Sequence, residues 1–179
     1  MRSIYKLVVC SLLTLSITSC EKDLLDKEQY QKEIYLIGAY NRVWTTEVSY
    51  SNEEVKTYFT VSSSGTLALD RDVNVKMKIN EELVDIYNKK YWTVLNEDKY
   101  YKSLDTDLYS IPSLENTVIK HAEGISAEVP VLIKTASLKI DQSYVIPVEI
   151  ESTTGYPISE SGYKMLILLK LKNDYSGSY

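Results

Sequence analysis

The sequence has few of the residues on which thiol, metal and imidazole chemistry depends. Its 179 residues include two cysteines and one histidine, His121. Cys10 lies within an apolar N-terminal stretch and Cys20 lies just after it. If Cys20 is consumed by modification, as argued below, the globular part of the chain holds no free thiol. Cysteine nucleophiles, zinc–thiolate sites and disulfide frameworks are then excluded.

Clustered positive charge is also missing, and the formal net charge of the whole chain is −5. Nucleic acids are bound through clustered Lys and Arg side chains, so the composition argues against a nucleic-acid partner.

Phenylalanine is nearly absent: Phe59 is the only one, beside 16 tyrosines. Tyrosine suits pleated, half-solvated surfaces, so the composition indicates exposed β-structure and suits contact surfaces.

The N-terminus has the pattern of a secretory signal. Arg2 and Lys6 precede an apolar stretch, residues 7–17, which is too short for the roughly 20 residues of a membrane-spanning helix. The residues Ile17-Thr18-Ser19-Cys20 resemble a bacterial lipobox, whose cysteine is diacylated and becomes the mature N-terminus. We therefore predict a signal peptide over 1–19 and lipidation of Cys20, with two acyl chains holding the protein to a membrane. A conventional or uncleaved signal with an incidental cysteine is the alternative.

The charged residues after Cys20 bear on where the protein is sorted. Glu21-Lys22-Asp23 resembles the signal that sends lipoproteins of the Bacteroidetes to the cell surface. We expect an outer-membrane, lipid-anchored protein at the cell surface, with the periplasmic face as the alternative. Loss of the signal removes two positive charges and leaves 160 residues. A chain of this length can form one stable domain without a disulfide or a structural metal. We divide this part into a tether (20–32), one domain (33–172) and a C-terminal tail (173–179).

Apolar periodicity predicts mostly β-structure. The clearest strand is 73–79, in which apolar and polar residues alternate strictly. Asn80 then suits a helix N-cap, and a short helix from Glu81 to about Lys90 follows. Other strands are predicted at 33–38 with a possible extension over 44–50, and at 54–61, 109–112, 117–120, 128–135, 144–151 and 163–172. Pro130 suggests an edge strand, whereas the apolar run in 163–172 predicts a central strand covered on both faces. About eight strands and one helix indicate an antiparallel β-sandwich.

Several of these motifs together resemble a known family. They are Val73-x-Val75-x-Met77-x-Ile79 with Glu82-Leu83-Val84-x-x-Tyr87-Asn88, then Tyr109-x-Ile111-Pro112 with Thr117-Val118-Ile119 and Gly124, and finally Leu138 with Tyr144-x-x-Pro147-Val148-x-Ile150. They resemble a domain of unknown function common at the N-terminus of Bacteroidetes surface lipoproteins. The resemblance implies an immunoglobulin-like sandwich, often followed by a carbohydrate-binding or family-18 glycosidase domain and linked to polysaccharide utilisation. The motifs mark strands and turns and carry no catalytic residue.

No constellation of catalytic or metal-binding residues is evident. His121 lies in a predicted loop, and the sequence has no G-x-S-x-G motif to supply a serine nucleophile beside a histidine. Asp70-Arg71-Asp72 and Asp105-Thr106-Asp107 lack the remaining features of a calcium loop, so we interpret both as solvated turns. No pair of carboxylates is singled out for glycoside hydrolysis. We therefore expect no catalytic residue, no metal and no cofactor.

Aromatic residues are the remaining candidates for a site. Tyr91, Trp92, Tyr100 and Tyr101 fall in one irregular stretch, and Trp44 is a further candidate. Their rings suit stacking on sugar C–H faces, while the alternative interpretation is that they pack over one end of the sandwich.

We accordingly expect a non-enzymatic, lipid-anchored surface module that binds polysaccharide or outer-membrane glycan-uptake proteins. The alternative is a structural or adhesin-like protein that contacts another protein through an edge strand or a Tyr-rich face. The third hypothesis is that the protein is an enzyme. Hydrolysis of a glycan that is abolished by a single carboxylate substitution would establish it.

Overall fold

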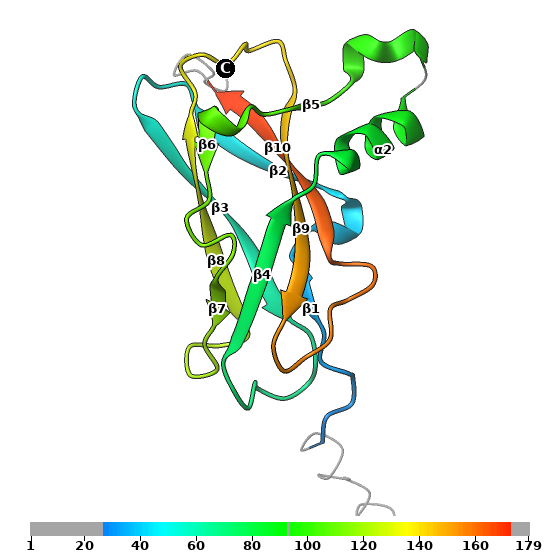
Figure 1. Ribbon diagram of the computed structural model, residues 1–179, viewed down its shortest axis with the longest axis vertical. Coiled ribbons are helices and arrows are strands. Elements are labelled where there is room, and N and C mark those ends of the chain that lie inside the picture. The colour runs from blue at the N-terminus through cyan, green and yellow to red at the C-terminus, as the bar shows by residue number, and fades with distance from the viewer. Residues whose placement is uncertain (1–26, 93, 173–179) are drawn as a thin grey trace, which may run out of the picture.

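The computed structural model describes residues 27–92 and 94–172 and confirms the predicted β-sandwich with one short α-helix (Figure 1). The predicted signal, Cys20, residues 20–26 of the tether and the tail 173–179 lie outside the described residues. The strands are β1 (Ile34–Leu36), β2 (Val43–Ser49), β3 (Glu54–Ser63), β4 (Val73–Ile79), β5 (Lys102–Ser103), β6 (Tyr109–Ser110), β7 (Thr117–Ile119), β8 (Ser126–Lys134), β9 (Tyr144–Thr153) and β10 (Lys164–Lys172). The helix is α2 (Glu82–Tyr91), and short 3-10 turns form η2 (Ala39–Asn41), η3 (Val94–Lys99) and η4 (Thr106–Leu108).

Two sheets face each other across the core. The first has the order β1-β3-β8-β6, and the second has the order β2-β10-β9-β4-β7, with β5 paired to β9. The alternating pattern of β4 is confirmed, since Val73, Val75 and Met77 are fully buried. These side chains join Phe59 and the inward residues of β8 and β9 in one core between the sheets. Within residues 27–92 and 94–172, every helix falls short of the length and apolarity that a membrane span needs.

The second sheet is mixed, which the prediction of antiparallel strands did not include. β2 runs parallel to β10, with Val43 beside Leu166 and Ser49 beside Lys172, and the short β5 runs parallel to β9. Residues 43–49 also form a strand of their own instead of extending the first one. The cause is η2, because this turn carries the chain out of the first sheet after β1 and into the edge of the second.

Strand β10 is central and covered on both faces, as its apolar run predicts. Met165 and Ile167 point into the sandwich core, whereas Leu166 contacts a second small cluster that includes Leu83 and Val84 of α2. The helix therefore lies on the outer face of the second sheet. It begins at Glu82, one residue later than predicted. Glu81 occupies the N-cap position without a side-chain hydrogen bond.

Asn80 still helps to hold the start of α2, although it lies one residue before the N-cap. Its Oδ1 accepts a hydrogen bond from the backbone N–H of Glu82 at 3.2 Å. Its carbonyl oxygen accepts a second one from the N–H of Leu83, also at 3.2 Å. Two N–H groups that the helix itself leaves without partners are thus satisfied.

Strand β8 lies between β3 and β6, so the prediction of an edge strand at Pro130 is wrong for the strand as a whole. The short β6 pairs only with Leu132 and Ile133. Pro130 lies beyond that ladder and is opposite Tyr58 of β3 on the other side. A proline, which has no N–H, is tolerated where the neighbouring ladder has ended.

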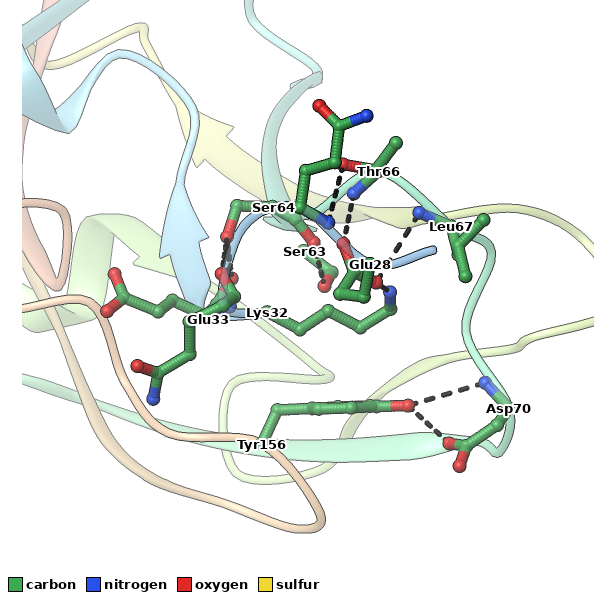
Figure 2. A network of polar contacts seen from close by, with 11 residues as sticks. Glu28, Lys32, Glu33, Ser63, Ser64, Thr66, Leu67, Asp70 and Tyr156 are labelled. Atoms are coloured by element: carbon green, nitrogen blue, oxygen red, sulfur yellow. Dashed lines mark hydrogen bonds and ion pairs between the residues drawn. The ribbon is translucent and has the colours of Figure 1, made fainter. Parts of the chain in front are cut away.

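Part of the predicted tether is fastened to the domain. Figure 2 shows residues 28–33 lying against the loop that follows β3. The Glu28 carboxylate accepts the backbone N–H of Thr66 at 2.5 Å and forms an ion pair with Lys32. Ser64 Oγ accepts the N–H of Glu33 at 2.9 Å. These contacts fix where the chain enters the sandwich.

At the same end, Asp70 joins two loops. Its carboxylate accepts hydrogen bonds from the Arg71 guanidinium at 3.0 and 2.9 Å. It also accepts one from the Tyr156 hydroxyl (Figure 2). The hydrogen bonds from Arg71 and then Tyr156 hold the pKa of Asp70 well below its usual value. The carboxylate is therefore charged in the native state at pH values where it is already protonated in the unfolded chain.

This depressed pKa gives a prediction for acid stability. A group whose native pKa is lowered stabilises the fold above its unfolded pKa of about 3.9, and the contribution is lost as the pH falls below that value. Asp70→Asn should therefore lose less stability than the wild type on acidification from about pH 5 to pH 3. Thermal melts across this range measure the effect, with Asp141→Asn in an exposed turn as the control. Equal acid slopes for Asp70→Asn and the wild type would contradict the prediction.

Candidate functional site

Three of the tyrosines form a stack on the outer side of the second sheet. Tyr87 and Tyr91 lie one turn apart on α2, and their ring centroids are 4.4 Å apart. Tyr101, just before β5, stacks on Tyr87 at 5.2 Å with an interplanar angle of 11°. Spacing of i and i+4 places the first two on one helix face. We call Tyr87, Tyr91 and Tyr101 the tyrosine stack.

The tyrosine stack is anchored by a buried asparagine. Asn88 is only 4% exposed. Its Nδ2 donates to the carbonyl oxygen of Tyr101 at 2.9 Å, and its Oδ1 accepts the N–H of Tyr101 at 3.0 Å. Tyr101 also packs against the cluster beneath α2. Of the predicted ligand residues, Tyr101 therefore packs against this cluster, and its role in ligand binding stays a prediction.

The other residues of the predicted stretch differ in exposure. Tyr91 is 48% exposed, and Lys90 Nζ lies 5.3 Å from its ring centroid. Trp92 and Tyr100 are half-buried. The Nε1 of Trp92 is buried and has no hydrogen-bond partner among the described residues. Tyr91 thus presents the most open ring of the predicted stretch.

Trp44 does not join this group. Val43, its neighbour on β2, contacts the cluster under α2. Because successive side chains of a strand point to opposite faces, Trp44 points to the other side of the sheet. There it packs against Gly38, where a Cβ would lie 2.6 Å from Trp44 Cε3. Gly38 also has φ +90°, so both space and backbone require glycine.

A groove of about 230 Å³ lies beside the tyrosine stack. It is formed by η2, α2 and the turn that leads into β10, all on one side of the sandwich (Figure 1). Its lining residues are Ala39, Tyr40, Arg42, Leu83, Ile86, Tyr87, Glu160, Ser161, Tyr163, Lys164, Met165 and Leu166. We call this the tyrosine groove, because Tyr40, Tyr87 and Tyr163 supply its rings.

Sequence reasoning missed the tyrosine groove, apart from noting Tyr87. Its lining comes from residues 39–42, 83–87 and 160–166, which are far apart in the chain. No periodicity or motif connects them. The one local signal was the density of tyrosine, which indicates contact surfaces without saying which rings meet.

Polar groups in the tyrosine groove are suited to hydrogen bonding. Burial, and then the neighbouring Tyr101, raise the pKa of Tyr87. Its hydroxyl therefore remains a neutral donor and acceptor at physiological pH. Lys164 Nζ lies 4.8 Å from the ring centroid of Tyr163. Ser161 and Glu160 are exposed and add a hydroxyl and a carboxylate.

Arg42 has the unusual backbone of this site. Its φ of 62° is the only positive value outside glycine in the described part of the chain. The backbone is held firmly, because its N–H donates to Ala39 O and its carbonyl accepts the N–H of Leu166, each at 2.8 Å. The residue thereby joins η2 to β10 within the lining of the tyrosine groove.

His121 pairs with Asp72 at the opposite end of the domain. Its Nδ1 lies 2.6 Å from Asp72 Oδ1, and both side chains are about half exposed. The hydrogen bonds from His121 lower the pKa of Asp72. Across residues 27–92 and 94–172, no three His, Cys, Asp or Glu side chains gather as metal ligands. The pair closes a surface turn.

Solved structures share this fold. A protein of unknown function from Bacteroides ovatus superposes with a TM-score of 0.69 at 20% identity, over 84% of this chain and 49% of the other. A candidate carbohydrate-binding protein from the same organism superposes with a TM-score of 0.59 at 18% identity, over 77% of this chain and 36% of the other. An auxiliary nutrient-binding protein from Bacteroides thetaiotaomicron superposes with a TM-score of 0.61 at 16% identity, over 78% of this chain and 47% of the other.

These likenesses establish the fold, and this chain spans half or less of the length of each of the three proteins. No curated protein matches the sequence significantly. A family model for an N-terminal domain matches residues 30–157, which is most of the chain. This range contains the strand and turn motifs from Val73 to Ile150. The chain therefore belongs to this family of N-terminal domains, and the three structural neighbours given above are Bacteroides proteins described as binding proteins or as a protein of unknown function.

Proposed function

We propose that the chain is a lipid-anchored, non-catalytic surface module for glycan capture and that the tyrosine groove holds the sugar. Cys20, outside the described residues, supplies the anchor in this proposal. The observation that carries it is the lining of the groove, where three tyrosine rings meet hydroxyl, carboxylate and cationic groups. Rings stack on the C–H faces of sugars, and polar groups fix the hydroxyls.

The dimensions of the groove suit one sugar unit of a longer chain. Pockets that enclose drug-sized ligands measure about 300–1,000 Å³, whereas this groove measures about 230 Å³. Tyr40, at 65% exposure, and Ile86, at 52%, form its open rim. A polysaccharide can therefore continue beyond the bound unit without displacing the helix.

The same lining supports binding instead of hydrolysis. Glycosidases place two carboxyl groups about 5–9.5 Å apart on either side of the scissile bond. Glu160 is the only carboxylate among the residues that line the tyrosine groove. The two neighbours described as carbohydrate- and nutrient-binding proteins agree with a binding role.

Tyr40→Ala is the test of this proposal. Loss of an exposed stacking ring should weaken binding of a polysaccharide by roughly fivefold, since such contacts contribute about 1 kcal/mol. Tyr40 is largely exposed, so the fold should be retained. Calorimetry or affinity electrophoresis against a broad polysaccharide panel measures the effect. Tyr58→Ala, an exposed ring on the first sheet, is the matched control. Absence of binding across the panel, or equal losses in both variants, would contradict the proposal.

An exposed apolar turn favours a second candidate function. Val94 and Leu95 of η3 are 76% and 94% exposed, and the open ring of Tyr91 precedes them. Exposed apolar groups that lie together indicate a protein contact. The domain would then bind an outer-membrane glycan-uptake protein or act as an adhesin-like module. Co-purification with such a partner in the absence of glycan affinity would favour this function.

A further inference from the structure

We infer that the tyrosine groove selects an acidic sugar, one that carries a carboxylate or sulfate group, and that Arg42 binds the anion. This inference rests on the proposed function, since it names the class of glycan that the groove takes. It is carried by the charges of the lining, by the pairing of the arginines and by the backbone of Arg42.

The tyrosine groove is positive within an acidic protein. Two cations, Arg42 and Lys164, line it beside a single acid, Glu160, whereas the chain as a whole has a formal net charge of −5. Lys164 lies over the ring of Tyr163, which places its charge on the aromatic wall. An anion entering the groove therefore meets two positive groups.

The two arginines in the described part of the chain differ in their partners. Arg71 forms a two-pronged interaction with Asp70, at 3.0 and 2.9 Å. Arg42 is exposed, and its guanidinium has neither an ion pair nor a hydrogen bond with any described residue. A guanidinium presents a planar fork that matches carboxylate and sulfate oxygens. In Arg42 that fork remains available to a ligand.

The backbone of Arg42 points to the same conclusion. At φ 62° and ψ −19° the residue closes η2 in the left-handed region, which glycine enters freely and arginine seldom does. Glycine is the residue that normally ends a helical turn in this conformation. Strained residues of this kind are common at binding sites, so the backbone of Arg42 supports a role for its side chain.

Glu160 defines the rest of the ligand. A carboxylate accepts hydrogen bonds from sugar hydroxyls but repels a second anion. We therefore expect one acidic group, directed toward Arg42, and hydroxyls directed toward Glu160. The exposed ring face of Tyr40 contacts the apolar side of the same sugar.

Calorimetry on the domain tests the inference with four probes. These are trigalacturonate, its methyl ester, sulfated lactose and lactose, so each acid has a neutral counterpart. At least one acid should bind about tenfold or more tightly than its neutral counterpart, because charge-assisted hydrogen bonds are the strong ones. That affinity should fall as sodium chloride is raised. The two acids show whether carboxylate or sulfate is preferred.

Variants at position 42 separate the charge from the fold. Arg42→Gln should reduce binding of the acidic probe to the level of its neutral counterpart. Arg42→Gly should do the same while its thermal midpoint equals or exceeds that of the wild type, because glycine relaxes the backbone. Lys170→Gln removes a cation from the exposed part of β10 outside the groove and should leave binding unchanged.

The possible failures are distinguishable. Equal binding of acidic and neutral probes would overturn the selectivity and leave the proposed glycan binding intact. Full acid preference in Arg42→Gln would overturn the role of Arg42. Absence of binding for all four probes and across the wider polysaccharide panel would overturn both the inference and the proposed function.

Discussion

Replacing Asn88 by alanine is expected to destabilise the domain by about 2–4 kcal/mol and to detach the tyrosine stack from the sheet. The side chain is buried and makes two hydrogen bonds with the backbone of Tyr101. Alanine would leave the N–H and the carbonyl oxygen of Tyr101 without these partners. Chemical denaturation measures the loss, and near-ultraviolet circular dichroism reports the tyrosine environment.

Asn88→Asp is the matched variant. Aspartate has nearly the same shape and keeps an acceptor for the N–H of Tyr101, but it cannot donate to the carbonyl oxygen. Its ionised form would also place a charge in a buried site. We expect a loss at least as large as that of alanine at neutral pH, recovering in part as the pH falls. Unchanged stability in both variants would show that Asn88 does not anchor Tyr101.

Phe59→Ala is expected to cost about 3–5 kcal/mol, the usual range for removing a buried aromatic ring. Phe59 is 2% exposed on β3 and belongs to the core between the two sheets. Its loss leaves a cavity that close-packed strands cannot fill. Urea unfolding with an unchanged slope and a lower midpoint is the expected result.

Tyr58→Ala provides the control on the same strand. Tyr58 immediately precedes Phe59, points to the opposite face and is 42% exposed. We expect a change within about 0.5 kcal/mol for this surface substitution. Equal losses at the two positions would mean that the alternation of β3 does not decide burial. The same variant serves as the binding control for Tyr40→Ala.

The fold was predictable where the signal is local. Strict alternation identified 73–79 with its observed bounds, and the continuous apolar run identified β10 as a strand covered on both faces. The pairing of β2 was not predictable, because nothing in residues 43–49 specifies a parallel partner more than a hundred residues away. Turn geometry at η2 decides it, and that geometry depends on Gly38 and Arg42 adopting positive φ.

The candidate site was predictable only in part. Tyr87 and Tyr91 are one helical turn apart, so a shared face follows from their spacing. Trp44 was grouped with them by residue type alone. Val43 contacts the cluster under α2. Trp44 is the next residue of the same strand, so its side chain points to the other face of the sheet. Tyr40, Arg42 and Tyr163 carried no sequence signal, since their neighbours in space come from other elements.

Composition and local pattern alone predict a β-rich domain with one helix and few thiol or imidazole groups. Those features follow from composition and short-range periodicity, which act within a single strand or turn. Tertiary packing selects which tyrosines form a stack, which line a groove and which of the two arginines in residues 27–92 and 94–172 has no ion-pair partner. These are contacts between distant segments, fixed by the chain crossing at η2 and by the packing of α2 on β10.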